Sequence, residues 1–136
     1  MRLTVPWLVP LLTLATSAFA TDWKVVGDDS DITAYYHPAS LRKSGSSVRL
    51  WTMNDYKKGQ RVEGRLIRSI KSQHEFDCAA KKRRLLFAAI HPQQMGRGIP
   101  VYAGLNPTRW EPIVPDSGEA YLWQFACAKR KSGTSG

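Results

Sequence analysis

Three histidines are the residues of this 136-residue chain best suited to acid–base or metal chemistry. His37, His74 and His91 each lie within or at the end of a segment whose composition is typical of a β-strand. If the fold brought them together, they could hold a metal ion or a haem. Separate histidines on strands are much more common than such a site, so we expect neither a metal nor another cofactor.

Catalysis by a serine nucleophile or by paired carboxylates has little support. The chain contains no Gly-x-Ser-x-Gly motif, and Ser69 and Ser72 are close to His74 only along a strand, with Ser69 on its opposite face. Glu75 and Asp77 share a strand face, but we expect that face to be exposed and both residues to pair with nearby lysines. The sequence therefore predicts a protein that is not an enzyme.

The candidate residues around His74 belong to one alternating stretch, residues 65–78 (RLIRSIKSQHEFDC). Side chains of a strand alternate between two faces, so Ile70, Phe76 and Cys78 share a face that we expect to point inward and to receive a helix. Three polar residues on this inner face are candidates for a ligand groove: Arg68, Ser72 and His74. They either line a groove beside the helix or lie in water where the sheet extends beyond it. The opposite face, expected in water, carries Arg65, Ile67, Ser69, Lys71, Gln73, Glu75 and Asp77.

Positive charge is concentrated around this stretch. The chain has a formal charge of +9 at pH 7, and the segment 57–84 carries many more lysines and arginines than acids. Basic surfaces attract polyanions through salt-sensitive fields. The candidate polyanion patch, for lipopolysaccharide or an acidic glycan, consists of Lys81, Lys82, Arg83 and Arg84. The alternative is a solvated basic face that keeps an exported protein soluble.

The first 20 residues have the pattern of a signal peptide. Arg2 precedes an apolar stretch over residues 5–14, and Ala18 and Ala20 form a small-x-small cleavage site. This apolar stretch is too short for a membrane span of about 20 residues, and no cysteine near the cleavage site would carry a lipid. We expect cleavage after Ala20, a domain over residues 21–130 without a transmembrane segment, a flexible tail over 131–136, and a periplasmic or secreted product.

The two cysteines predict one disulfide bond, because exported proteins oxidise their thiols. Cys78 would pair with Cys127 and close a loop of about 50 residues, which should stabilise the fold by roughly 4 kcal/mol.

Strand patterns dominate the chain up to residue 114. We expect strands over residues 23–26, 32–37, 48–56, 65–78, 83–91 and 99–103, with a broken edge segment over 110–114. Pro38 should end the second strand, and residues 57–64 should form a polar connection. From residue 116 to 129 the pattern is helical, with Asp116 or Ser117 as N-cap and Glu119 in the first turn. The sequence thus predicts an α+β domain: an antiparallel sheet of about six strands with a C-terminal helix tethered to one face by the disulfide.

Several segments resemble a known family when taken in order. They are WTMNDY at 51–56, RSIK at 68–71, EFDC at 75–78, Trp110, PDSG at 115–118 and AC at 126–127. Together they make the chain similar to the surface-adhesin protein E family. The resemblance implies a small antiparallel sheet with a disulfide-tethered C-terminal helix, and a role like that of an adhesin that binds host extracellular-matrix and serum proteins. Only Cys78 and Cys127 correspond residue by residue, in a structural role, and this chain lacks the lipid-anchor cysteine of that adhesin.

The predicted function is therefore an exported, adhesin-like module that binds a protein partner through a sheet edge or the helix-side groove. The alternative is a periplasmic binder of a polyanion or small ligand that uses the basic residues. Either function is compatible with a homodimer. An uncharacterised hydrolase is the third reading of the sequence.

Overall fold

The computed structural model describes residues 22–105 and 107–132, with side chains up to Ala128. The predicted signal peptide and its cleavage site, and residues 133–136 of the predicted tail, lie outside the described residues.

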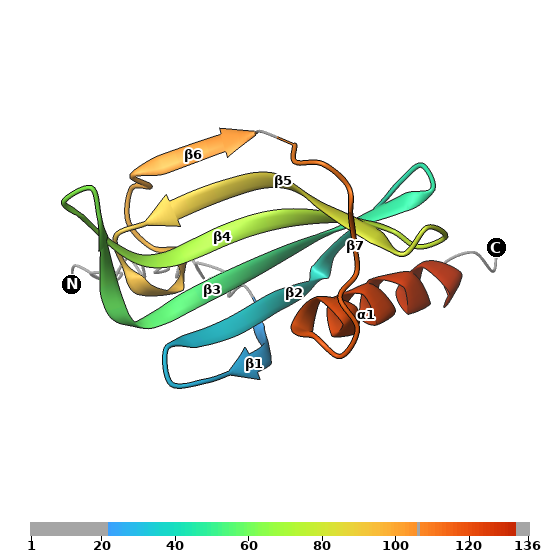
Figure 1. Ribbon diagram of the computed structural model, residues 1–136, viewed down its shortest axis with the longest axis horizontal. Helices are drawn as coiled ribbons and strands as arrows, with labels where there is room; N and C mark the ends of the chain where they lie inside the picture. The colour runs from blue at the N-terminus through green and yellow to red at the C-terminus, as the bar shows by residue number, and fades with distance from the viewer. Residues whose placement is uncertain (1–21, 106, 133–136) are drawn as a thin grey trace, which may run out of the picture.

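One antiparallel sheet and one helix make up the described fold (Figure 1). The sheet runs in chain order: β1 (Lys24–Asp28), β2 (Ile32–Ser44), β3 (Ser47–Val62), β4 (Arg65–Asp77), β5 (Lys82–His91) and β6 (Tyr102–Leu105). The remaining elements are the 3-10 turn η1 (Gln94–Gly96), the short strand β7 (Glu111–Pro112), which pairs with β5, and the helix α1 (Gly118–Ser132). This confirms the α+β class and the antiparallel sheet with a C-terminal helix. The helix continues to Ser132, so it includes the start of the predicted tail.

The prediction that Pro38 ends the second strand is wrong. β2 runs on to Ser44, because its pairing with β3 is interrupted between His37 and Arg42 and no ladder hydrogen bond is required of proline there. The Ser40 hydroxyl fills the interruption. It accepts a hydrogen bond from the Trp51 N–H at 2.9 Å and donates one to the His37 carbonyl at 2.6 Å.

The expected connection over residues 57–64 is also mostly strand. β3 extends to Val62, and only Glu63 and Gly64 form the turn into β4. Both turn residues have positive φ, 50° and 77°, as a two-residue hairpin that matches the twist of the strands requires.

The main core lies between α1 and one face of the sheet. Val48, Leu50 and Phe76 are fully buried there and pack with Leu122 and Ala126 of the helix. Ser117 caps the helix by accepting a hydrogen bond from the Ala120 N–H at 3.2 Å, as predicted. The predicted inner face of β4 is therefore right for Phe76 and Cys78, whereas Ile70 is not part of this core.

The prediction that the opposite face of the sheet lies in water is wrong for Glu75. Glu75 is only 4% exposed. It lies directly between Arg49 of β3 and Arg84 of β5, and its carboxylate contacts both guanidinium groups, at 3.2 Å and 3.1 Å. The Ser47 hydroxyl donates to the same carboxylate at 3.1 Å. Glu75 therefore pairs with arginines across the strands and not with the lysines near it in sequence.

Replacing this carboxylate should weaken the fold. In Glu75→Gln two arginines lose their counterion, so we expect the free energy of unfolding to fall by about 2 kcal/mol; the partial exposure of Arg49 keeps the loss below that of a fully buried pair. Denaturant unfolding of the oxidised protein measures it. The matched control is Glu111→Gln, because Glu111 is 65% exposed in its ion pair with Arg83 and should contribute almost nothing. Equal losses in the two variants would contradict the structural role of Glu75.

Candidate functional site

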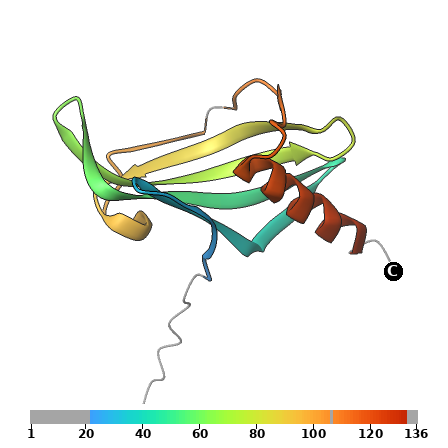
Figure 2. The same ribbon diagram turned by 60° about the horizontal axis from the view of Figure 1, so that its bottom comes forward.

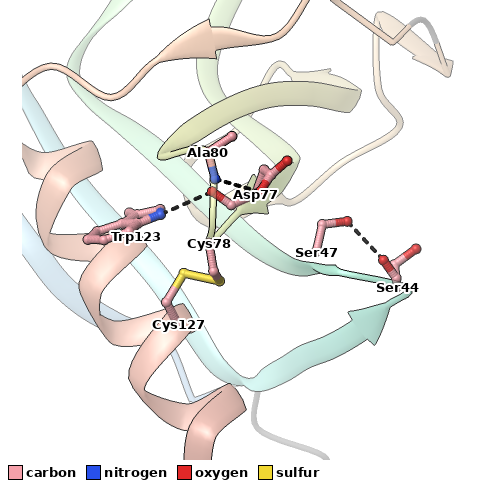
Figure 3. The surroundings of a disulfide bond; sticks show 7 residues. All are labelled: Ser44, Ser47, Asp77, Cys78, Ala80, Trp123 and Cys127. Atoms are coloured by element: carbon pink, nitrogen blue, oxygen red, sulfur yellow. Dashed lines mark hydrogen bonds between the residues drawn. A yellow bond between two sulfur atoms is a disulfide. The ribbon is translucent and has the colours of Figure 1, made fainter.

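The disulfide between Cys78 and Cys127 fixes α1 to the end of β4 (Figure 3). Beside it, the Trp123 indole N–H donates a hydrogen bond to the Asp77 carbonyl at 3.4 Å. The Asp77 carboxylate accepts the N–H of Ala80 at 2.9 Å and so shapes the turn into β5. These contacts confirm the predicted tether and hold the helix at the end of the sheet where the β4–β5 turn lies.

The helix covers only part of the face on which it lies. Figures 1 and 2 show α1 beside one end of the sheet, with the long hairpin of β3 and β4 extending well beyond it. Where the helix begins, a cavity of about 240 Å³ remains between helix and sheet. This helix-side pocket is lined by Val26, Ala34, Tyr35, Thr52, Asn54, His74, Arg83, Gly118, Glu119 and Leu122.

His74 is the predicted groove residue that lines this pocket. Its Nδ1 is buried and has no hydrogen-bond partner among the described residues, and its ring stacks on Phe76 at 6.2 Å. Burial lowers the pKa of His74, and the nearby positive charge of Arg83 adds to this effect, so that the pKa falls from 6.5 to about 4. The imidazole is therefore neutral at pH 7, when it can accept one hydrogen bond and donate one.

The two other predicted groove residues lie progressively further from the helix. Ser72 is next to His74 on the same face of β4 and directly opposite Thr52 of β3. Arg68 is exposed near Gly59, in the part of the sheet beyond the helix. The structure therefore places His74 with Thr52 and separates it from Arg68.

Arg83 closes the side of the pocket nearest the β4–β5 turn. Its guanidinium forms an ion pair with Glu119 of the helix and a second one with Glu111, at 3.8 Å. The same Glu119 accepts the Val114 N–H at 2.7 Å. Sequence reasoning missed Thr52, Asn54 and Glu119 as pocket residues. The alternation of β3 was a usable signal, since it places Thr52 on the same face as Leu50.

The four residues of the predicted polyanion patch do not form one surface. Arg83 points to the helix side, while Arg84 pairs with Glu75 on the opposite face and stacks over Trp110 at 4.5 Å. Lys81 and Lys82 are exposed, and the Lys81 ammonium lies 5.8 Å from the ring centre of Trp123. The polyanion patch remains a prediction, and its exposed charge consists of these two lysines.

The three histidines do not all lie on one face of the sheet. His37 follows the inward-facing Tyr36 and so lies on the face opposite α1, whereas His74 lies on the helix side. His91 is buried at the end of β5, where its Nδ1 is 3.0 Å from the Gly98 carbonyl. Within the residues that the structure describes, no cluster of three or more His, Cys, Asp or Glu side chains is suited to hold a metal ion.

Comparison with known proteins decides the family. The family model described as surface-adhesin protein E matches residues 23–128. The chain belongs to the surface-adhesin protein E family. The match spans every strand of the sheet and both cysteines, so the resemblance predicted from the sequence is confirmed.

Solved structures of protein E share the fold of this family member. A crystal structure of protein E from non-typeable Haemophilus influenzae has a TM-score of 0.65 and 15% sequence identity, with 97% of this chain and 86% of that chain covered. Crystal form II of Haemophilus influenzae protein E gives a TM-score of 0.61 and 16% identity, covering 76% and 92% of the two chains. No curated protein sequence matches the chain. Among the described residues of this protein E relative, no helix is long and apolar enough to cross a membrane.

The lowered pKa of His74 predicts a specific dependence of stability on pH. The unfolded chain binds this proton near pH 6.5 and the folded protein only near pH 4. The contribution of His74 to stability should be complete above pH 6.5 and decline as the pH falls to 4, by on the order of 3 kcal/mol in total. His74→Leu removes the titrating group. Its free energy of unfolding, measured with denaturant, should therefore rise relative to that of the wild type as the pH falls from 6.5 to 4. Thr52→Val, which alters a non-titrating neighbour, should keep the wild-type slope. Parallel curves for wild type and His74→Leu would contradict the burial of a neutral imidazole.

Proposed function

We propose that this protein is an exported, non-catalytic, adhesin-like module that binds a protein partner at the cell envelope or outside the cell. Membership of the surface-adhesin protein E family supports the general role. The observation that carries the binding mode is the open edge of β6, where the partner would add an extended segment to the sheet.

The β6 edge is apolar and carries no charged residue. In the sheet order β6 pairs with β5 on one side, and no described strand pairs with its other side. Tyr102 and Leu105 of β6 are 52% and 73% exposed, and Ile99, in the connection before β6, is 87% exposed. Edge strands normally carry charges, prolines or bulges that prevent pairing with other chains. The sequence of β6, YAGL, has no charge or proline.

The opposite edge of the sheet shows the usual protection. β1 begins with Lys24 and ends with Asp28, and its pairing with β2 is irregular between Val25 and Gly27. The contrast between the two edges supports β6 as the side that accepts a partner.

A recess next to β6 could add selectivity. A cavity of about 470 Å³ lies between the β3–β4 hairpin and the start of β6, with Val62, Ile67 and Tyr102 among its lining residues. The Arg65 guanidinium donates to the Val101 carbonyl at 3.3 Å and joins the hairpin to this segment. In strand addition, backbone hydrogen bonds give affinity and pockets for side chains give specificity. We infer that the partner is an extended segment with an apolar side chain at the recess.

Lysines placed on this edge test the proposal. Tyr102→Lys with Leu105→Lys should weaken saturable binding to immobilised extracellular-matrix or serum proteins by at least about tenfold, because a charged edge resists strand addition. Surface plasmon resonance with the oxidised mature chain provides the affinity. The matched control is Val25→Lys, which charges a 56% exposed apolar residue on the opposite edge and should bind as the wild type does.

The polyanion alternative predicts the reverse pattern. If the exposed lysines mediate binding, Lys81→Glu with Lys82→Glu should abolish retention on heparin, and the retention should fall steeply with salt. Full partner binding by the β6 double variant, together with its loss in the lysine variant, would refute the β6 proposal. Sedimentation analysis of both variants identifies the other possible occupant of the edge, a second copy of the same chain.

A further inference from the structure

A third cavity lies on the sheet face opposite α1. It has a volume of about 380 Å³ and is lined by Trp23, His37, Trp51, Lys71, Met95 and Gly96. None of these residues lines the helix-side pocket or the recess beside β6. We call it the tryptophan pocket. Its location follows from strand alternation, because His37 and Trp51 are paired across β2 and β3, each next to a core residue that points toward the helix.

One wall of the tryptophan pocket is held in place by buried polar groups. Ser69 is fully buried, and its hydroxyl donates to the Gln93 carbonyl at 2.6 Å while accepting the Gly96 N–H at 2.9 Å. The Asp55 carboxylate accepts the Met95 N–H at 2.8 Å. Met95 has a φ of 58°, a left-handed conformation that a methionine adopts only when its surroundings enforce it. This wall is therefore built in advance of any ligand.

The pocket contains a positive charge without a counterion. The side chain of Lys71 lies against Gly96, where a Cβ atom would come within 2.7 Å of the lysine Cδ. No described carboxylate forms an ion pair with Lys71. Asp55, the acid of the adjacent strand, accepts the Met95 N–H and forms no ion pair with Lys71. An anionic group of a ligand would supply the missing partner.

Aromatic rings form the other walls. The Trp23 and His37 rings lie 5.5 Å apart, and Trp51 is fixed by an edge contact with Phe87, also at 5.5 Å between ring centres. Trp23 and Trp51 are each only partly buried. Indole rings held in this way offer flat apolar surface together with an N–H donor.

We propose that the tryptophan pocket binds a single acidic sugar residue, of the uronic or sialic acid class, with the ring packed on the indoles and the carboxylate paired with Lys71. A cationic ligand would be repelled by Lys71, and a polyphosphate would require more than one positive charge. The volume is near the lower end of the range of about 300–1,000 Å³ for small-ligand sites, which fits one sugar ring better than an oligosaccharide. This site is separate from the β6 edge and does not depend on it.

Titration of the oxidised mature chain with sugar acids tests the assignment by NMR of the tryptophan indole N–H groups. Glucuronic acid and N-acetylneuraminic acid are the probes, and their methyl esters are the matched neutral controls. At least one acid should shift the Trp23 and Trp51 signals saturably, with a dissociation constant on the order of 1 mM. Trp110 and Trp123, which lie outside the pocket, should not shift. The esters should bind at least about tenfold more weakly.

Two substitutions assign the interaction to individual side chains. Lys71→Met keeps the hydrocarbon stem beside Gly96 but removes the charge, so it should erase the preference for acid over ester. Trp23→Ala should weaken the binding of the acid and of its ester alike. Lys43→Met is the control for charge, because Lys43 is exposed in β2 and lines no part of the pocket.

Three outcomes would overturn the proposal. They are the absence of saturable shifts with either acid, equal binding of acids and esters, and tighter binding of indole-3-acetate than of both sugar acids. The last would assign the pocket to an aromatic carboxylate instead. Thermal unfolding confirms that each variant is folded before it is compared.

Discussion

The single described helix covers only part of one face of a much longer sheet. The Cys78–Cys127 disulfide determines where that helix lies. The bond joins the end of β4 to α1, so the helix side chains bury Val48, Leu50 and Phe76 at one end of the sheet. In a domain whose net stability is only about 5–15 kcal/mol, a crosslink of this kind has a large effect. The open part of the same face begins where the helix begins, and the pocket around His74 is the direct result.

Two different sets of contacts cover parts of the sheet face that has no helix. At one end Glu75 neutralises arginines from the strands on either side of it. Toward the other end η1 lies over the fully buried Ser69, whose hydroxyl donates to the Gln93 carbonyl and accepts the Gly96 N–H. The tryptophan pocket lies beside η1, where Trp51 and Lys71 remain partly exposed. The helix-side pocket and the tryptophan pocket thus each lie where a covering element stops.

Local patterns predicted much of this arrangement. Strand alternation and the two cysteines identified Phe76 and Cys78 as residues beneath the helix, and capping chemistry placed its start at Asp116 or Ser117, of which Ser117 is the cap. The same alternation failed for Glu75, because the partners that bury it come from neighbouring strands whose register the sequence does not reveal. Arg83 and Arg84 are adjacent in sequence, yet they form ion pairs on opposite faces of β5. The tryptophan pocket could not be predicted from the sequence, because Trp23 and Met95 come together only in the folded chain.

The central claim is that the disulfide keeps α1 on the sheet, and native-state hydrogen exchange measures this directly. In the oxidised protein the amides of α1 should be protected nearly as well as those of β3 and β4, because helix and strands share one core. After selective reduction, the α1 amides should exchange at least about tenfold faster, while the middle of β3 and β4 loses less protection. Unchanged protection of α1 after reduction would show that packing alone holds the helix and would contradict the claim.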